Sequence, residues 1–133
     1  MHIDWDEKWS IGNELIDAHH KEFIKAANKF VFSSNEDCSN VSTVLAFLME
    51  YVAVHFYEEE KLLEKCGYPD IKQHKLQHTV LKANSSRLAT EYEMKGASVK
   101  LKANLKKLIA DWLLNHIEIE DKKIGDYIQK KKK

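Results

Sequence analysis

The sequence predicts an all-α protein, folded as an up-down-up-down antiparallel four-helix bundle with an N-terminal arm. Apolar residues recur every three or four positions over long stretches, with almost no strand-like alternation. Glycine and proline are sparse, being limited to Gly12, Gly67, Pro69, Gly96 and Gly125. The connections between the helical stretches are short, which favours antiparallel packing of consecutive helices.

The arm and the first helix occupy the first quarter of the chain. Residues 1–12 show no helical pattern, and their two tryptophans, Trp5 and Trp9, are expected to pack the arm against the bundle. The first helix is predicted over about 13–32, followed by a polar loop over 33–40. The stripe that this helix should bury contains Ile16, His20, Phe23, Ala27 and Phe30.

The second helix is predicted over about 41–65. It ends at Gly67-Tyr68-Pro69-Asp70, because glycine supplies a helix stop and proline cannot continue a helix. Its stripe contains Val41, Leu45, Leu48, Val52, His55, Glu59, Leu62 and Cys66.

The third and fourth helices are predicted over about 70–94 and 98–128, with Gly96 between them. The stripe of the third contains Ile71, His74, His78, Leu81, Ser85, Leu88 and Tyr92. The stripe of the fourth contains Leu101, Leu105, Leu108, Trp112 and His116.

Composition and charge bound the class of protein. The 133 residues suit a single domain over 1–133, with 44% hydrophobic and 32% charged residues. The net charge is zero, so we expect neither a nucleic-acid partner nor a membrane surface, and the run 130–133 is expected to be a frayed, solvated tail. No apolar run approaches the roughly 20 residues of a membrane span, and no signal peptide is apparent, which predicts a cytoplasmic protein. Cys38 and Cys66 are isolated, and both are expected to be reduced thiols.

Histidines and a glutamate interrupt the buried stripes at positions that suit metal ligation. His55 with Glu59, and His74 with His78, are four apart and therefore lie on one helix face. Burying such polar groups without partners costs on the order of 1–3 kcal/mol each. The set is therefore interpreted as a metal site, with these candidate ligands: His20, His55, Glu59, His74, His78, His116 and Asp121.

Mixed imidazole and carboxylate ligation suits iron or manganese, whereas a structural zinc site usually takes a closed set of four ligands. With two bridging carboxylates and one bridging solvent oxygen, the candidate ligands leave one position open on a pair of six-coordinate irons. Periodicity alone does not choose between Asp121 and its neighbours Glu118 and Glu120, since Asp121 lies five residues after His116. His19 also lies near the stripe.

Several segments in order resemble the bacterial hemerythrins, and the resemblance covers nearly the whole chain. These segments are Trp5, Asp17-Ala18-His19-His20-Lys21, His55-Phe56-Tyr57-Glu58-Glu59, Gly67-Tyr68-Pro69, His74-Lys75-Leu76-Gln77-His78, and Trp112-Leu113-Leu114-Asn115-His116-Ile117 followed by Asp121. The family pattern selects His20 over His19, Asp121 over Glu118 and Glu120, and Glu59 over Glu58 and Glu60. His19 is then an exposed group or a partner of a ligand.

The resemblance implies a non-haem di-iron centre that binds dioxygen reversibly. His74, His78 and His116 would hold one iron, His20 and His55 would hold the other, and Glu59 and Asp121 would bridge. The expected oxygen pocket is apolar and contains Phe23, Phe56, Trp112, Leu113 and Ile117.

Binding is favoured over an enzymatic role, because a dry apolar pocket discourages protonation and the sequence contains no Glu-x-x-His motif of the oxygen-activating di-iron bundles. The expected role is an oxygen carrier, store or sensor, with a stand-alone binder preferred and a monomer favoured. The alternatives are a di-iron enzyme acting on peroxide or nitric oxide, and a metal-storage or zinc protein.

Overall fold

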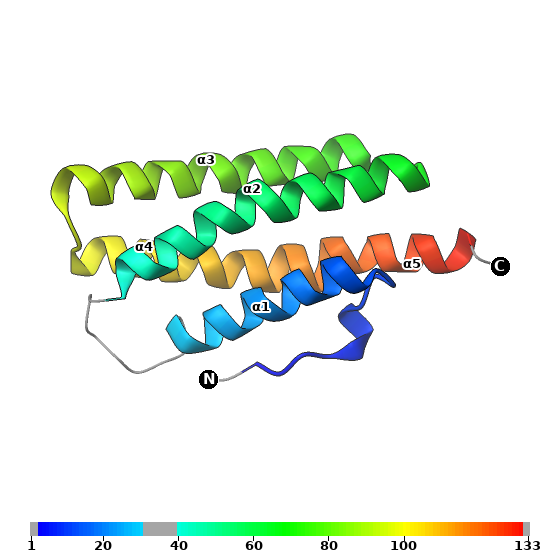
Figure 1. Cartoon of the computed structure of the whole chain (residues 1–133), viewed down its shortest axis with the longest axis horizontal. Coiled ribbons are helices and arrows are strands. Elements are labelled where there is room, and N and C mark those ends of the chain that lie inside the picture. The colour runs from blue at the N-terminus through cyan, green and yellow to red at the C-terminus, as the bar shows by residue number, and fades with distance from the viewer. Residues whose placement is uncertain (1–2, 31–39, 132–133) are drawn as a thin grey trace.

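The protein is an antiparallel four-helix bundle, as predicted. The computed structural model describes residues 3–30 and 40–131, and no strand occurs in these ranges. Figure 1 shows consecutive helices running in opposite directions, with the last three segments forming one continuous rod. The helical segments are η1 (Glu7–Trp9), α1 (Glu14–Phe30), α2 (Val41–Cys66), α3 (Ile71–Lys95), α4 (Val99–Asp111), η2 (Trp112–Asp121) and α5 (Lys122–Lys131).

Local hydrogen bonds explain where the helices begin and end. The side chain of Asn13 accepts a hydrogen bond from the backbone N–H of Ile16 at the start of α1, and Ser98 accepts one from Leu101 at the start of α4, each at 3.0 Å. Gly67 ends α2 in the left-handed conformation, with φ of 69°, which a residue with a side chain rarely adopts. The predicted break between the second and third helices lies here.

Two predicted features differ in the structure, and others fall outside its description. The predicted fourth helix is three consecutive segments, because a π-helical stretch, η2, separates α4 from α5. Lys130 and Lys131 are not a frayed tail, since they form the last turn of α5 and Lys131 Nζ donates to the carbonyl of Cys66 at 2.6 Å. Residues 31–32 of the predicted first helix, residues 33–39 of the loop predicted over 33–40, and Cys38 lie outside the described residues.

The N-terminal arm packs along the bundle, as its tryptophans predict. Trp5 and Trp9 meet edge to face with ring centroids 5.9 Å apart, and both pack against the main core. Asp17 accepts hydrogen bonds from Ser10 Oγ at 2.5 Å and from the backbone N–H of Ile11 at 2.9 Å. These contacts fasten the arm to the first turn of α1.

The core consists of two apolar clusters with a polar layer between them. The larger cluster contains residues such as Phe23, Phe56 and Leu81, whereas the smaller one contains Ile11, Ile16, Leu63, Tyr68 and Ile124. On α1 the buried His20 lies between Ile16 of the smaller cluster and Phe23 of the larger one, and on α2 Glu59 lies between Leu63 and Phe56 in the same way. None of the described helices combines the length and apolar character needed to cross a bilayer.

Candidate metal centre

The polar layer brings together all seven predicted ligands from the four helices of the bundle. Each of these residues is at most 3% exposed, which is unusual for histidine, aspartate and glutamate. The residues are His20 on α1, His55 and Glu59 on α2, His74 and His78 on α3, and His116 and Asp121 on η2. Their ligand atoms form two groups, each within 4.8 Å: one contains Glu59, His74, His78 and His116, and the other contains His20, His55, Glu59 and Asp121.

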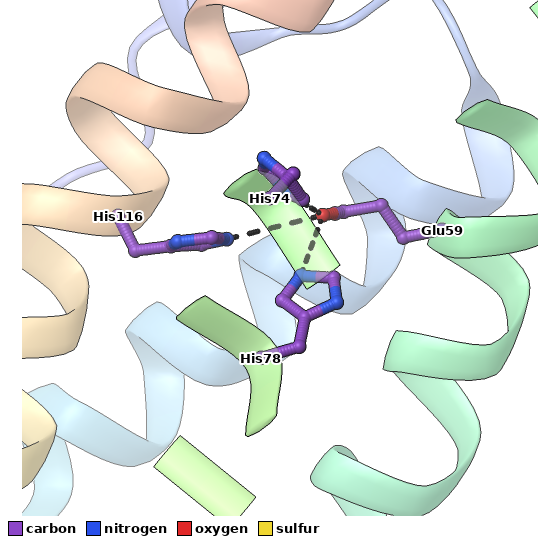
Figure 2. A group of neighbouring side chains, drawn as sticks. All are labelled: Glu59, His74, His78 and His116. Atoms are coloured by element: carbon purple, nitrogen blue, oxygen red, sulfur yellow. Dashed lines mark hydrogen bonds and ion pairs between the residues drawn. The ribbon is translucent and has the colours of Figure 1, made fainter. Parts of the chain in front are cut away.

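Glu59 divides its two carboxylate oxygens between the groups. Oε1 lies 2.5 Å from His74 Nε2, 3.0 Å from His78 Nε2 and 3.9 Å from His116 Nε2, and Figure 2 shows these three imidazoles arranged around it. Oε2 faces the other way, 3.0 Å from His55 Nε2 and 3.4 Å from His20 Nε2. One carboxylate therefore reaches both groups.

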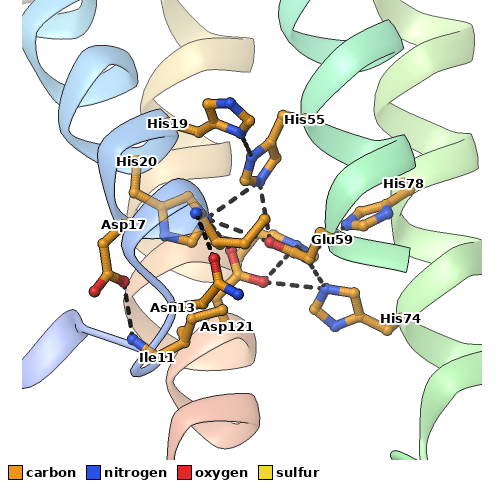
Figure 3. Close-up of polar contacts among 12 residues, drawn as sticks. Ile11, Asn13, Asp17, His19, His20, His55, Glu59, His74, His78 and Asp121 are labelled. Atoms are coloured by element: carbon orange, nitrogen blue, oxygen red, sulfur yellow. Dashed lines mark hydrogen bonds and ion pairs between the residues drawn. The ribbon is translucent and has the colours of Figure 1, made fainter. Parts of the chain in front are cut away.

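Asp121, at the end of η2, repeats this arrangement. Its Oδ1 lies 3.0 Å from His74 Nε2 and 3.2 Å from His116 Nε2, whereas Oδ2 lies 3.0 Å from His20 Nε2. Figure 3 shows Asp121 and Glu59 among His20, His55 and His74. The centre thus has three imidazoles on one side, two on the other, and two carboxylates shared between them.

Four of the converging atoms have no hydrogen-bond partner among the described residues. Glu59 Oε2, both carboxylate oxygens of Asp121, and His116 Nε2 are buried and receive no hydrogen bond from any described residue, although charged or polar atoms lie close by. Nearly all buried polar atoms in proteins have a partner. The Nε2 atoms of His20 and His55 lie 3.2 Å from each other. Lone pairs that meet in this way suit a cation between them.

The electrostatics of the metal-free cluster favour protonated His20 and His74 beside ionised carboxylates. Burial lowers the pKa of His20 and His74, but the neighbouring Asp121 and Glu59 outweigh burial and raise each pKa to about 10. Burial raises the pKa of Glu59, yet the charge of His55 and contacts with other imidazoles hold that pKa well below its usual range. Without metal, the protons on His20 and His74 therefore balance carboxylate charge that bound metal ions would otherwise balance.

The π-helical segment η2 explains how His116 and Asp121 reach the same centre. In a π-helix the hydrogen bonds run from i to i+5, so residues five apart come back to one face. Asp121 is fully buried, whereas Glu120 points outward and pairs with Lys123 Nζ at 3.2 Å. Glu118 is partly buried and lies outside both groups. The local widening of the helix thus places Asp121, and neither of its acidic neighbours, among the buried histidines.

Sequence reasoning offered His19 as an exposed group or a partner of a ligand, but it did not name Glu60 or Gln77 as partners of the imidazoles. The Nδ1 atoms of three histidines lie within hydrogen-bonding distance of His19 Nδ1, Glu60 Oε2 and Gln77 Oε1. The distances are 3.0 Å for His55 with His19, 2.8 Å for His78 with Glu60, and 2.7 Å for His116 with Gln77. Spacing along one helix could not predict these contacts, since each partner lies on a different helix from the histidine that it contacts.

Tyr51 also went unnoticed, although it lies one helical turn before His55 on the same face. Its ring stacks on His55 at 4.6 Å, and its hydroxyl accepts a hydrogen bond from Trp112 Nε1 at 3.2 Å. Trp112 stacks on His116 at 3.7 Å, and Phe56 stacks on His78 at 3.9 Å. All five residues of the predicted oxygen pocket are buried: Phe23, Phe56, Trp112, Leu113 and Ile117.

Fold and site together define a helical-bundle metal-binding protein with a histidine- and carboxylate-rich centre. The family model of the hemerythrin HHE cation binding domain matches residues 11–128, and the chain therefore belongs to the hemerythrin family.

Relatives in other organisms match most of the chain. It is 28% identical to a bacteriohemerythrin of Stenotrophomonas maltophilia, over 94% of this chain and 80% of the relative. It is 31% identical to a bacteriohemerythrin of Methylococcus capsulatus, over 82% of each chain. It is also 29% identical to a myohemerythrin of Theromyzon tessulatum, over 88% of this chain and 86% of the relative. The resemblance noted in the sequence is thus confirmed.

Proposed function

We propose that the protein binds dioxygen reversibly at a non-haem di-iron centre, as an oxygen carrier, store or sensor. The observation that carries this proposal is the division of both shared carboxylates. Glu59 and Asp121 each direct one oxygen to the three-imidazole group and the other to the two-imidazole group. Two carboxylates placed in this way suit two cations, because each anion can neutralise part of both charges.

The residues present fit a pair of iron ions. Five imidazoles and two carboxylates exceed the four ligands of a closed structural zinc site, and this mixture of nitrogen and oxygen donors suits iron. His74, His78 and His116 would hold one ion, His20 and His55 the other, with Glu59 and Asp121 shared. When bound, the two ferrous ions supply electrons that dioxygen takes up on binding and returns on release.

The uneven distribution of imidazoles indicates where a small ligand would enter. Because Glu59 and Asp121 each reach both sides, the side with His20 and His55 has one imidazole fewer than the side with His74, His78 and His116, and the protein offers fewer donors there. An external ligand can compete for a metal ion where the protein leaves its coordination incomplete. We therefore assign the dioxygen side to His20 and His55.

Buried apolar side chains support binding rather than turnover. Phe23, Leu113 and Ile117 are each at most 1% exposed, and Phe56 and Trp112 at most 8%. Apolar walls exclude bulk water and the acids that would protonate a reduced oxygen species. We propose that these residues line the ligand pocket and that the protein is not an enzyme.

Absorption spectroscopy of the iron-loaded, reduced protein tests this function. A visible absorption band should appear when dioxygen is admitted and vanish when it is removed under argon, over repeated cycles. The variant Glu59→Gln should lose this response, while Glu58→Gln, the same change one residue away, should keep it. Irreversible oxidation in the first cycle, or consumption of added peroxide or nitric oxide with turnover, would instead indicate a di-iron enzyme.

A further inference from the structure

We propose that His19 is a positioning residue, whose Nδ1 accepts a hydrogen bond from His55 Nδ1–H and so directs His55 Nε2 into the metal centre. This inference rests on the proposed function, since it takes His55 as a metal ligand. His19 precedes the predicted ligand His20 on α1, but it lies outside both ligand groups.

The geometry places His19 behind His55. The two Nδ1 atoms lie 3.0 Å apart, and the rings meet edge to face with centroids separated by 5.1 Å. The opposite nitrogen of His55, Nε2, lies 3.0 Å from Glu59 Oε2. Figure 3 shows this order, with His19 outermost, His55 next and Glu59 inside. The imidazole of His55 is therefore held at one nitrogen and directed inward at the other.

The chemistry of imidazole fixes which partner donates. A histidine that binds a metal through Nε2 carries its proton on Nδ1, so Nδ1–H must donate outward. His19 Nδ1 must then accept, which requires the neutral tautomer with its proton on Nε2. His19 is half-buried and lines a groove of about 200 Å³ together with Glu22 and Glu50, so water can reach its other nitrogen.

This contact distinguishes the two sides of the centre. On the three-imidazole side, His78 and His116 are held by oxygen acceptors from Glu60 and Gln77. On the two-imidazole side, His20 Nδ1 is buried with no hydrogen-bond partner among the described residues. On the two-imidazole side, the contact of His55 with His19 is therefore the one outer hydrogen bond described, whereas the three-imidazole side has two. Losing His19 should disturb its side more than losing either Glu60 or Gln77 would disturb the other.

Titration of the metal-free protein with cobalt(II), followed by calorimetry and visible absorption, tests the role of His19. The wild-type chain should bind two ions. His19→Leu removes the acceptor and should weaken binding of one ion by about 10- to 100-fold, the usual effect of losing the partner of a ligating histidine. The other ion should bind unchanged. His19→Gln restores an acceptor oxygen and should recover affinity to within a few-fold of wild type.

The matched control is Glu22→Leu, which makes an apolar substitution in the same groove without touching the acceptor, and should bind both ions as wild type does. Circular dichroism of each metal-free variant verifies the helical fold. Equal affinities in wild type and His19→Leu, or equal losses in His19→Leu and His19→Gln, would overturn the positioning role while leaving a wild-type two-ion centre in place. A wild-type chain that binds fewer than two ions would overturn the proposed di-metal centre itself.

Discussion

Loading the centre with iron should stabilise the fold strongly, because the metal-free centre buries polar atoms without hydrogen-bond partners. Four such atoms face the cluster: one oxygen of Glu59, both carboxylate oxygens of Asp121 and Nε2 of His116. Each costs about 1–3 kcal/mol, so together they cost at least about 4 kcal/mol. That amount is a large part of the about 5–15 kcal/mol by which a small domain is stable.

Thermal unfolding measured by far-ultraviolet circular dichroism gives the assay. For a domain of this size, each kcal/mol shifts Tm by about 3–5 °C, so anaerobic loading with two equivalents of ferrous iron should raise Tm by at least about 12 °C. Glu59→Gln keeps the side-chain size but removes the shared charge, and should lose most of this shift. Glu58→Gln should keep it. Metal-free and loaded wild-type protein unfolding within about 2 °C of each other would refute the reasoning.

Three further predictions concern protons and packing. Because Asp121 raises the pKa of His20 and His74 to about 10 without metal, both are protonated near neutral pH, so metal binding should release protons and tighten as pH rises toward 10. Calorimetry in two buffers of different ionisation enthalpy measures the release, and identical heats would contradict it. Gly125→Ala should destabilise the fold by about 1–3 kcal/mol, because the added methyl would lie 2.8 Å from a backbone oxygen of the N-terminal arm. Tyr51→Phe should destabilise the fold by about 1–3 kcal/mol, because the buried indole N–H of Trp112 loses the hydroxyl that accepts its hydrogen bond. An unchanged urea midpoint would count against either packing prediction.

The fold was predictable because the residues that a helical bundle buries recur every three or four positions along each helix. The sequence placed Ile16, His20 and Phe23 on one buried face of the first helix, and the structure buries all three. Gly67 and Pro69 predicted the end of the second helix, and Gly67 ends α2 there in the left-handed conformation. The π-helical segment was harder to foresee, because a periodicity of 3.6 residues cannot represent a locally wider turn, and spacing alone left Asp121 undecided.

The sequence predicted the side chains that face the centre, but not most of the residues that contact those side chains from outside. Helical spacing and burial cost indicated six of the seven predicted ligands, because a buried Glu59 needs a partner, whereas Asp121 was selected by the family resemblance. The outer partners His19, Glu60 and Gln77 come from neighbouring helices, and their contacts depend on how the helices pack side by side. Tyr51 alone carried a local signal, since it precedes His55 by four residues on the same helix.

The central claim, that Glu59 and Asp121 each serve two metal ions, is tested most directly by anomalous diffraction at the iron absorption edge. Crystals of the protein loaded anaerobically with iron should show two peaks, one among His74, His78 and His116 and the other beside His20 and His55. Both carboxylates should lie between the peaks. A single peak, or two peaks with either carboxylate turned away, would contradict the account.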